Sequence, residues 1–168
     1  MDDLLAFIGG SHVGIGPLLG RLTAATFLGF LIGLDREYLN RPAGLRTHML
    51  VSLAAATFTL VMFELMGTFG ADPDVNADPI RVIEAATAGV AFLAAGTIIQ
   101  ARRQVHGLTT GAGLWLAGAV GTACGVGAFA TAIAATAFGI VVLILLRLVT
   151  HPNAGEEHDR GQSDSTKG

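Results

Sequence analysis

The stretch GLTTGAGLWLAGAVGTACGVGAFATAIAATAFGIVVLILL, from Gly107 to Leu146, decides the fold of this chain of 168 residues. It contains no Asp, Glu, Lys or Arg. A continuous helix of this length would measure about 60 Å at 1.5 Å per residue, which equals two hydrocarbon cores of a bilayer. The stretch therefore predicts two membrane spans, and the turn-like residues Gly125 to Gly127 divide it into spans at 108–124 and 128–149.

The rest of the composition agrees with a membrane protein and excludes several other classes. The chain is 52% hydrophobic and only 14% charged, and its 23 glycines lie among apolar residues, as in closely packed membrane helices. A formal net charge of −3 provides no basic field, which excludes nucleic-acid binding. The single cysteine, Cys124, excludes an internal disulfide and a cysteine-based metal site.

Three more apolar segments precede the uncharged stretch, at 15–34, 47–66 and 80–100. With them the sequence predicts an all-α bundle of five transmembrane helices, formed by residues 1–149 as one membrane domain. Residues 150–168 have no apolar periodicity, and we expect a disordered cytoplasmic tail there.

The distribution of basic residues predicts the orientation of the bundle. Eight of the ten Lys and Arg residues fall on one side of the predicted spans, and this side is normally cytoplasmic. The opposite side carries the acidic loop from Asp72 to Asp78. The N-terminus is therefore expected outside and the C-terminus inside, in a bacterial inner membrane. The eight residues are Arg36, Arg41, Arg46, Arg102, Arg103, Arg147, Arg160 and Lys167.

Small residues predict close contacts between the helices. Eight of the twelve residues in 85–96 are Ala or Gly, which predicts that this helix lies at the centre of the bundle. Gly29 and Gly33, and likewise Gly121 and Gly125, have the four-residue spacing of close helix crossings. Such crossings pack a single chain, or they form contacts with another membrane protein or a second copy, and spacing alone does not choose.

Four charges lie within or at the ends of the predicted spans: Arg21, Glu64, Arg81 and Glu84. One interpretation makes them interfacial anchors, with a local pair between Arg81 and Glu84, which are three residues apart on a helix. The other makes them a polar cluster under the acidic loop, able to bind a cation or a regulatory ligand.

No motif predicts a catalytic, metal or cofactor site. The loop from Asp72 to Asp78 resembles the first ligands of a calcium loop, but Ala77 stands where the required turn needs Gly, which excludes an EF-hand. Two interpretations remain for these carboxylates: a plain acidic loop, which is favoured, or weak, water-mediated binding of Mg²⁺ or Ca²⁺. The five histidines have no paired metal-ligand spacing, and no hydrolase or phosphate-binding motif is present. We therefore expect a protein that is not an enzyme and has no cofactor.

The densest polar segment is GLDREYLNRPAGLRTHMLV, from Gly33 to Val51. A topology anchor explains its arginines but leaves Asp35 and Glu37 without a role. A carboxylate that holds an arginine in a planar two-point contact explains both, and it would make the loop functional.

This segment resembles the signature of the MgtC/SapB family of bacterial inner-membrane proteins. The stretches DPIR at 78–81, AGTII at 95–99 and VHGLTTGAGLW at 105–115 follow in the expected order, so the resemblance covers about residues 15–149. It implies five spans with the N-terminus outside, and a link to growth in low magnesium and to survival of pathogens in macrophages. It also implies that some members regulate other membrane proteins, including the F-type ATP synthase.

The resemblance, with the charges described above, identifies the candidate functional residues. Two departures stand out: Asp35 replaces an expected Glu, and the chain ends in a short tail where longer members add a cytoplasmic domain, so we expect a short member. The candidates are Asp35, Arg36, Glu37, Pro42, Gly44, Arg46, Thr47 and His48 in the inner loop, Asp78, Arg81 and Glu84 at the third span, and Thr109 and Thr110 at the fourth.

The function expected from these features is regulation of another membrane complex through helix contacts, in adaptation to low magnesium or acid stress. The alternative is a transporter or channel for Mg²⁺ or another cation. It ranks second because residues 49–63 and 107–146 offer no charged path across the membrane. A third class, an intramembrane hydrolase, would depend on Thr109 or Thr110 with His106 as the base.

Overall fold

The computed structural model describes residues 12–38, 43–70, 78–101 and 104–150. Within these residues it contains five helices and one two-stranded sheet. The helices are α2 (Ile15–Tyr38), α3 (Leu45–Phe69), α4 (Pro79–Gly96), α5 (Leu108–Val126) and α6 (Phe129–Thr150), and the strands are β1 (Ile99–Ala101) and β2 (Gln104–His106). The helical fold class expected from the sequence is confirmed, and the helix bounds match the five apolar segments within a few residues.

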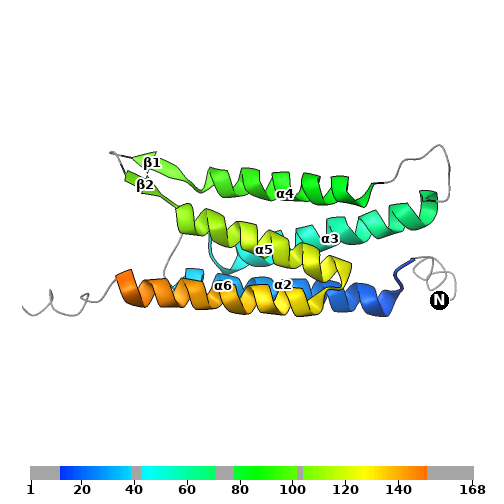
Figure 1. Cartoon of the computed structure of the whole chain (residues 1–168), viewed down its shortest axis with the longest axis horizontal. Coiled ribbons are helices and arrows are strands. Elements are labelled where there is room, and N and C mark those ends of the chain that lie inside the picture. The colour runs from blue at the N-terminus through cyan, green and yellow to red at the C-terminus, as the bar shows by residue number, and fades with distance from the viewer. Residues whose placement is uncertain (1–11, 39–42, 71–77, 102–103, 151–168) are drawn as a thin grey trace, which may run out of the picture.

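The helix α5 is the centre of the bundle. It contacts α2, α3, α4 and α6, and ten of its nineteen residues are buried. Figure 1 shows α4 along one side of the molecule and α2 with α6 along the other, with α3 and α5 between them. The core therefore lies among α2, α3 and α5, where Ile32, Leu114 and Val120 are fully or almost fully buried.

Glycines bring the backbones of these three helices into contact. A side chain at Gly121 would overlap the backbone of Ser52, and one at Gly125 would approach the backbone of Ala56 to 2.8 Å. On α2, a Cβ at Gly29 would lie 2.8 Å from the carbonyl oxygen of His48. These glycine pairs therefore pack the chain against itself, which decides one of the alternatives that the spacing left open.

The position expected for residues 85–96 is wrong. The helix that contains them, α4, lies at the edge of the bundle, and of its eighteen residues only Ala94 is buried. A Cβ at Gly89 or at Gly96 would meet no atom within 4 Å. Small residues permit close packing but supply little apolar area to bury, and α5, with its Gly121 and Gly125 contacts, takes the central place instead.

The third apolar segment also ends earlier than expected. Helix α4 stops at Gly96, and the next residues form a short antiparallel hairpin in which Ile99 pairs with His106. The chain enters α5 through Gly107 at φ 88°, where a Cβ would collide with the carbonyl of Thr97. The break expected near Gly125 to Gly127 is present, because α5 ends at Gly127 with φ 92°.

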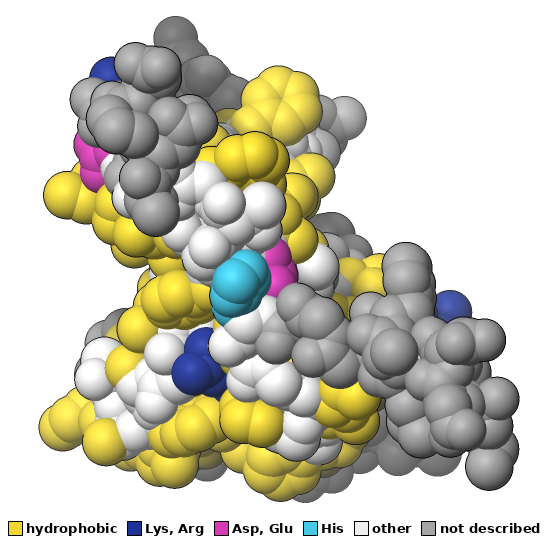
Figure 2. Space-filling view, turned by 90° about the vertical axis from the view of Figure 1, so that its right-hand side faces the viewer, with side chains coloured by type: hydrophobic (Ala, Val, Ile, Leu, Met, Phe, Trp, Pro, Cys, Tyr) yellow, Lys and Arg dark blue, Asp and Glu magenta, His cyan; other side chains and the backbone are white. Residues whose placement is uncertain are grey.

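The outer surface of the bundle is apolar, as a membrane protein requires. By length and composition, α2, α3 and α4 can each cross a membrane, and α6 contains a shorter apolar stretch from Phe129 to Leu145. Large side chains such as Phe27, Phe58 and Phe138 are more than half exposed. Seen end-on, much of the described surface consists of apolar side chains with few charges among them (Figure 2).

The helix ends gather in two groups. The end of α2, the starts of α3 and α5, and the hairpin lie together, and we call this the hairpin end (Figure 1). The end of α3 and the start of α4 lie at the opposite end. This arrangement places the two described ends of the inner loop, at Arg36 and Arg46, and the strands of the hairpin at the same end of the bundle.

Candidate functional site

Five of the residues that the sequence singled out meet at the hairpin end, where α2 ends and α3 begins. Arg36 is on the last turn of α2, yet it is only 4% exposed because it points into the bundle. Its Nε lies 4.0 Å from Oδ2 of Asp35. This is one long contact, so the Asp35–Arg36 pair lacks the planar two-point geometry that was expected between an acid and an arginine.

Glu37 has a different partner from the one that the sequence suggested. Its Oε2 accepts a hydrogen bond of 3.0 Å from the backbone N–H of Leu45, the first residue of α3. The N-cap residue of α3 is Gly44, which has no side chain to perform this task. A Cβ at Gly44 would overlap the Glu37 carboxylate, so glycine there makes room for a cap supplied by the preceding helix.

His48 is the most deeply buried polar residue of the cluster. Its side chain is 0% exposed, and Nδ1 lies 2.9 Å from the carbonyl oxygen of Gly44. The other ring nitrogen, Nε2, faces Gly113 of α5, where a Cβ would lie 3.0 Å away. Among the residues that the structure describes, Nε2 has no hydrogen-bond partner. The sequence indicated His48 but not Gly113, because the two residues are far apart in the chain.

Two buried hydroxyls continue this polar row along α3. The Ser52 hydroxyl donates a hydrogen bond of 2.7 Å to the carbonyl oxygen of Ala25 on α2, and the Thr59 hydroxyl donates one of 2.8 Å to Ala55 within α3. Both residues are at most 2% exposed. The sequence did not indicate this row, because single Ser and Thr residues in an apolar segment give no sign of which face they occupy.

The remaining inner-loop and fourth-span candidates lie outside this buried cluster. Arg46, Thr47 and Thr109 are exposed, and Pro42 lies outside the described residues. Within the described part of the chain, no ion pair involves Arg46. Thr110 is 3% exposed on the same stretch of α5 as Gly113. The structure thus brings Asp35, Arg36, Glu37, Gly44 and His48 together, and leaves Arg46 at the surface.

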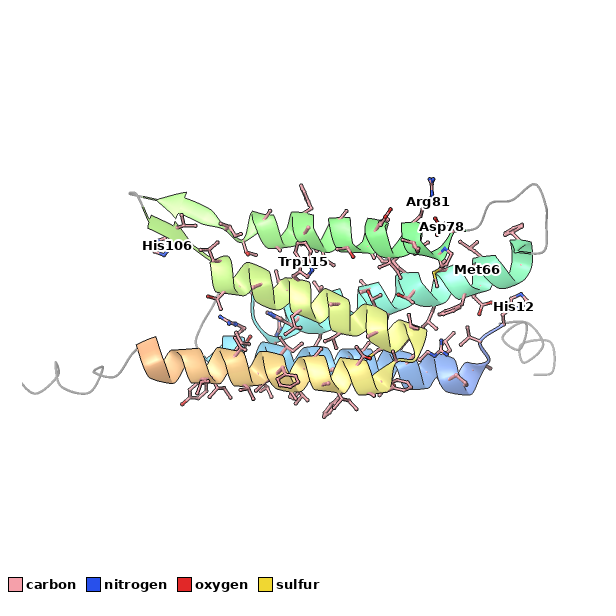
Figure 3. The ribbon with its side chains drawn as sticks, viewed as in Figure 1. His12, Met66, Asp78, Arg81, His106 and Trp115 are labelled. Atoms are coloured by element: carbon pink, nitrogen blue, oxygen red, sulfur yellow. The ribbon has the colours of Figure 1, made fainter. Side chains whose placement is uncertain are left out.

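The third-span candidates lie at the opposite end of the molecule (Figure 3). Asp78 caps α4, because its carboxylate accepts a 2.9 Å hydrogen bond from the backbone N–H of Ile80. Arg81 pairs with Asp78 at 4.0 Å and is 82% exposed. Glu84 is exposed as well. The pair that the sequence suggested between Arg81 and Glu84 is replaced by one with Asp78, which lies one turn earlier.

The two other charges near this end bind to backbone groups. The Arg21 guanidinium donates a 2.9 Å hydrogen bond to the carbonyl oxygen of Gly125 and lies 5.6 Å from the centre of the Phe63 ring. Gly125 lies in the last turn of α5, where carbonyl oxygens have no partner within the helix and where the helix dipole favours a cation. Glu64 accepts hydrogen bonds from the backbone N–H groups of His12 and Val13. Arg21 thus connects α2 to α5, and Glu64 connects α3 to the residues before α2, which goes beyond the role of an interfacial anchor.

The chemistry available at these positions is hydrogen bonding and charge pairing. No three side chains of His, Cys, Asp or Glu within the described ranges are placed to hold a metal ion. Cys124 is buried in the core against apolar neighbours, and burial in apolar surroundings makes a thiol inert.

Comparisons with known proteins find relatives over most of the chain. A model of the MgtC family matches residues 22–151. The chain is 39% identical over 131 residues to Protein MgtC of Salmonella typhimurium strain LT2, covering 78% of this chain and 53% of that protein. It is 41% identical over 126 residues to Protein MgtC of Brucella abortus strain 2308, covering 75% of this chain and 50% of that protein. No solved structure matches significantly.

The chain spans about half the length of the curated relatives it matches. The matched region contains the whole buried cluster at the hairpin end and all of helices α3 to α5. A family match over most of the chain, together with the apolar helices, establishes both what kind of molecule this is and where it resides: the chain is a membrane protein that belongs to the MgtC family.

Proposed function

We propose that this protein is a non-enzymatic, five-span inner-membrane protein that regulates another membrane complex through contacts made by α4. In this proposal the N-terminus is outside, the C-terminus is inside, and the protein serves adaptation to low magnesium or acid stress. Arg36 on the last turn of α2 and Arg46 at the start of α3 support the orientation, because both lie at the hairpin end of the bundle.

The observation that carries the proposal is the open face of α4, formed by Ala85, Ala88, Gly89, Phe92 and Gly96. All five residues are exposed, and Phe92 is 81% exposed. Ala85, Gly89, Phe92 and Gly96 follow one another at intervals of three or four residues, which places them along one side of the helix, and Ala88 lies next to Gly89. Small residues in a membrane helix permit a close approach of a second helix, and within the described chain no helix uses this face.

A comparison with α6 separates a protein-binding face from a lipid-facing one. The exposed residues of α6 include Ile133, Phe138, Val141 and Leu145, which are large side chains suited to acyl chains. The open face of α4 contains two glycines, Gly89 and Gly96, and contact with lipid does not require glycine. Glycine lowers helix stability by roughly 0.5–1 kcal/mol relative to alanine. Close contact with the backbone of another protein would offset this loss of helix stability.

A groove next to this face extends the surface available to a partner. It has a volume of about 570 Å³ and lies between α4 and α5, lined by residues that include Ala91, Ala95, Ile98, Ala112 and Trp115. Trp115 lies on α5 on the side that faces α4 (Figure 3). A groove lined mostly by alanine accepts the side chains of a partner helix. The partner proposed is therefore an integral membrane protein; the F-type ATP synthase is one candidate by family resemblance.

The test compares one bulky substitution on the open face with the same substitution elsewhere. Gly89→Leu fills the open face of α4, whereas Ala134→Leu adds a similar bulk on exposed α6. In a strain that lacks the gene and grows poorly in low magnesium, we expect Gly89→Leu to lose complementation at normal membrane levels. We expect Ala134→Leu to complement. Equal complementation by both would remove α4 as the contact surface.

One observation favours transport as a second candidate function. His48, Ser52 and Thr59 form a buried polar row through the apolar segment of α3. Both hydroxyls, however, donate to backbone carbonyls, and Gly121 and Gly125 bring the backbones of α5 and α3 into contact beside them. This packing favours a structural role for the row. Purified protein in sealed vesicles should show no Mg²⁺ or proton flux above background, and a saturable flux lost in Ser52→Ala would favour the transporter.

A further inference from the structure

The imidazole of His48 is held in one tautomer by the loop that precedes it. Nδ1 lies 2.9 Å from the carbonyl oxygen of Gly44, and a carbonyl oxygen can only accept a hydrogen bond. Nδ1 therefore carries the proton and donates it. In the neutral imidazole with this tautomer, Nε2 has a lone pair and acts as an acceptor.

This lone pair points into the core of the bundle. The His48 side chain is 0% exposed, and Nε2 makes no hydrogen bond to any group within the described residues. Buried polar atoms in proteins normally have a partner, which is either a protein group or an ordered water molecule. The nearest part of α5 is Gly113, where a Cβ would lie 3.0 Å from Nε2 and 4.0 Å from Nε of Arg36. Glycine at this position therefore keeps carbon away from the acceptor.

We propose that Nε2 of His48, Arg36 and Gly113 form a binding site for one buried water molecule, which donates a hydrogen bond to Nε2. The charges around the site favour a hydrogen-bond donor that is electrically neutral. A cation is disfavoured by the Arg36 guanidinium, and an anion by the lone pair of Nε2 and by the Asp35 carboxylate beside Arg36. Water is the smallest neutral donor, and it also has lone pairs that face the guanidinium.

The site connects the inner loop to the centre of the bundle. On one side of the imidazole ring, Nδ1 donates a hydrogen bond to the carbonyl oxygen of Gly44, which precedes α3. On the other side, the proposed water lies between Nε2 and Gly113 of α5. This inference stands on the geometry of His48 alone and does not depend on the proposed regulatory function. Failure of the Gly89 experiment would therefore leave it intact.

Solid-state NMR on protein in bilayers, with ring-¹⁵N histidine, tests the site directly. Magnetisation is transferred from water protons to the ring nitrogens, and His48→Gln identifies the signals of His48. In the wild-type protein we expect an unprotonated Nε2 that receives magnetisation from water although the side chain is fully buried. Gly113→Ala should remove this transfer, because its methyl group takes the space beside Nε2.

Gly111→Ala is the matched control. It adds the same methyl group to α5 two residues away, where the nearest atom is the carbonyl oxygen of Ala94 at 3.1 Å, and it should leave the transfer at His48 unchanged. The proposal is overturned by a proton on Nε2 in the wild-type protein, by no transfer from water to Nε2, or by equal transfer in wild-type and Gly113→Ala protein. The wild-type measurement decides even if Gly113→Ala does not fold.

Discussion

Replacement of Gly121 by alanine should destabilise the bundle, although alanine is the better helix former. The new methyl group would overlap the carbonyl oxygen of Ser52 and approach the carbonyl carbon and Cα of that residue to 2.8 Å. These are backbone atoms, so no rotation of a side chain relieves the overlap. Helices α3 and α5 would have to separate, and this pair is among the most extensive helix contacts of the fold.

The expected magnitude follows from two opposing effects. Overpacking of a tight core costs about 1–3 kcal/mol, while the change from glycine to alanine returns roughly 0.5–1 kcal/mol through the unfolded chain and helix propensity. The difference lies between about 0 and 2.5 kcal/mol, and at the middle of both ranges the free energy of unfolding falls by about 1 kcal/mol, which lowers the ratio of folded to unfolded protein about fivefold.

Gly89→Ala provides the control, because a Cβ there meets nothing within 4 Å. It should leave the free energy of unfolding unchanged or raise it by up to about 1 kcal/mol. Steric trapping of the purified protein in bicelles measures the free energy of unfolding of both variants and of the wild-type protein. If Gly121→Ala were as stable as Gly89→Ala, the close contact between α3 and α5 would be refuted.

Three further predictions concern the loop, the charged helix connection and the topology. Glu37→Ala removes the acceptor for the Leu45 N–H and should cost about 0.5–2 kcal/mol in thermal unfolding, whereas Arg46→Lys should have no effect; a silent Glu37→Ala would contradict the cap. Arg21→Met removes the donor to an α5 carbonyl and should cost roughly 1–2 kcal/mol of bicelle stability, and unchanged stability would exclude this role. A reporter inserted at Arg41 should be cytoplasmic and one at Asp74 periplasmic, and a periplasmic Arg41 would overturn the proposed orientation.

The helices could be predicted from sequence because each is an apolar segment bounded by charge or glycine. The division of the uncharged stretch near Gly125 to Gly127 was predicted correctly, since a glycine with positive φ ends α5 there. The hairpin was not predicted. Its strands have three residues each, and the apolar Ile99 continues the pattern of the preceding helix, so periodicity alone extends the helix too far.

The order of the helices in space could not be predicted from composition. Helices α4 and α5 are both rich in Ala and Gly, and small residues show only that a close approach is permitted. Which of the two helices packs closely depends on whether its glycines lie opposite the backbone of another helix, as Gly121 lies opposite Ser52. The same limit applies to the candidate site, where Gly113 completes the surroundings of His48 from a distant part of the chain.

The partners of charged residues were predicted only in part. The sequence placed acids and arginines in one loop, but it could not show that Glu37 caps α3 through the backbone of Leu45. It also could not show that Arg81 pairs with Asp78. Capping by a carboxylate competes with ion pairing for the same side chains, and the backbone geometry that decides between them is absent from the sequence.

The measurement that tests the central claim most directly is site-specific photo-crosslinking in native membranes from two exposed phenylalanine positions. Phe92 on the open face of α4 is 81% exposed, and Phe138 on α6 is 73% exposed, so a photoreactive phenylalanine analogue fits both sites equally. We predict that position 92 yields one discrete crosslinked membrane protein, that position 138 does not, and that Gly89→Leu abolishes the crosslink. Crosslinks from position 92 to lipid alone, or the same products from both positions, would contradict the claim that α4 is the regulatory contact surface.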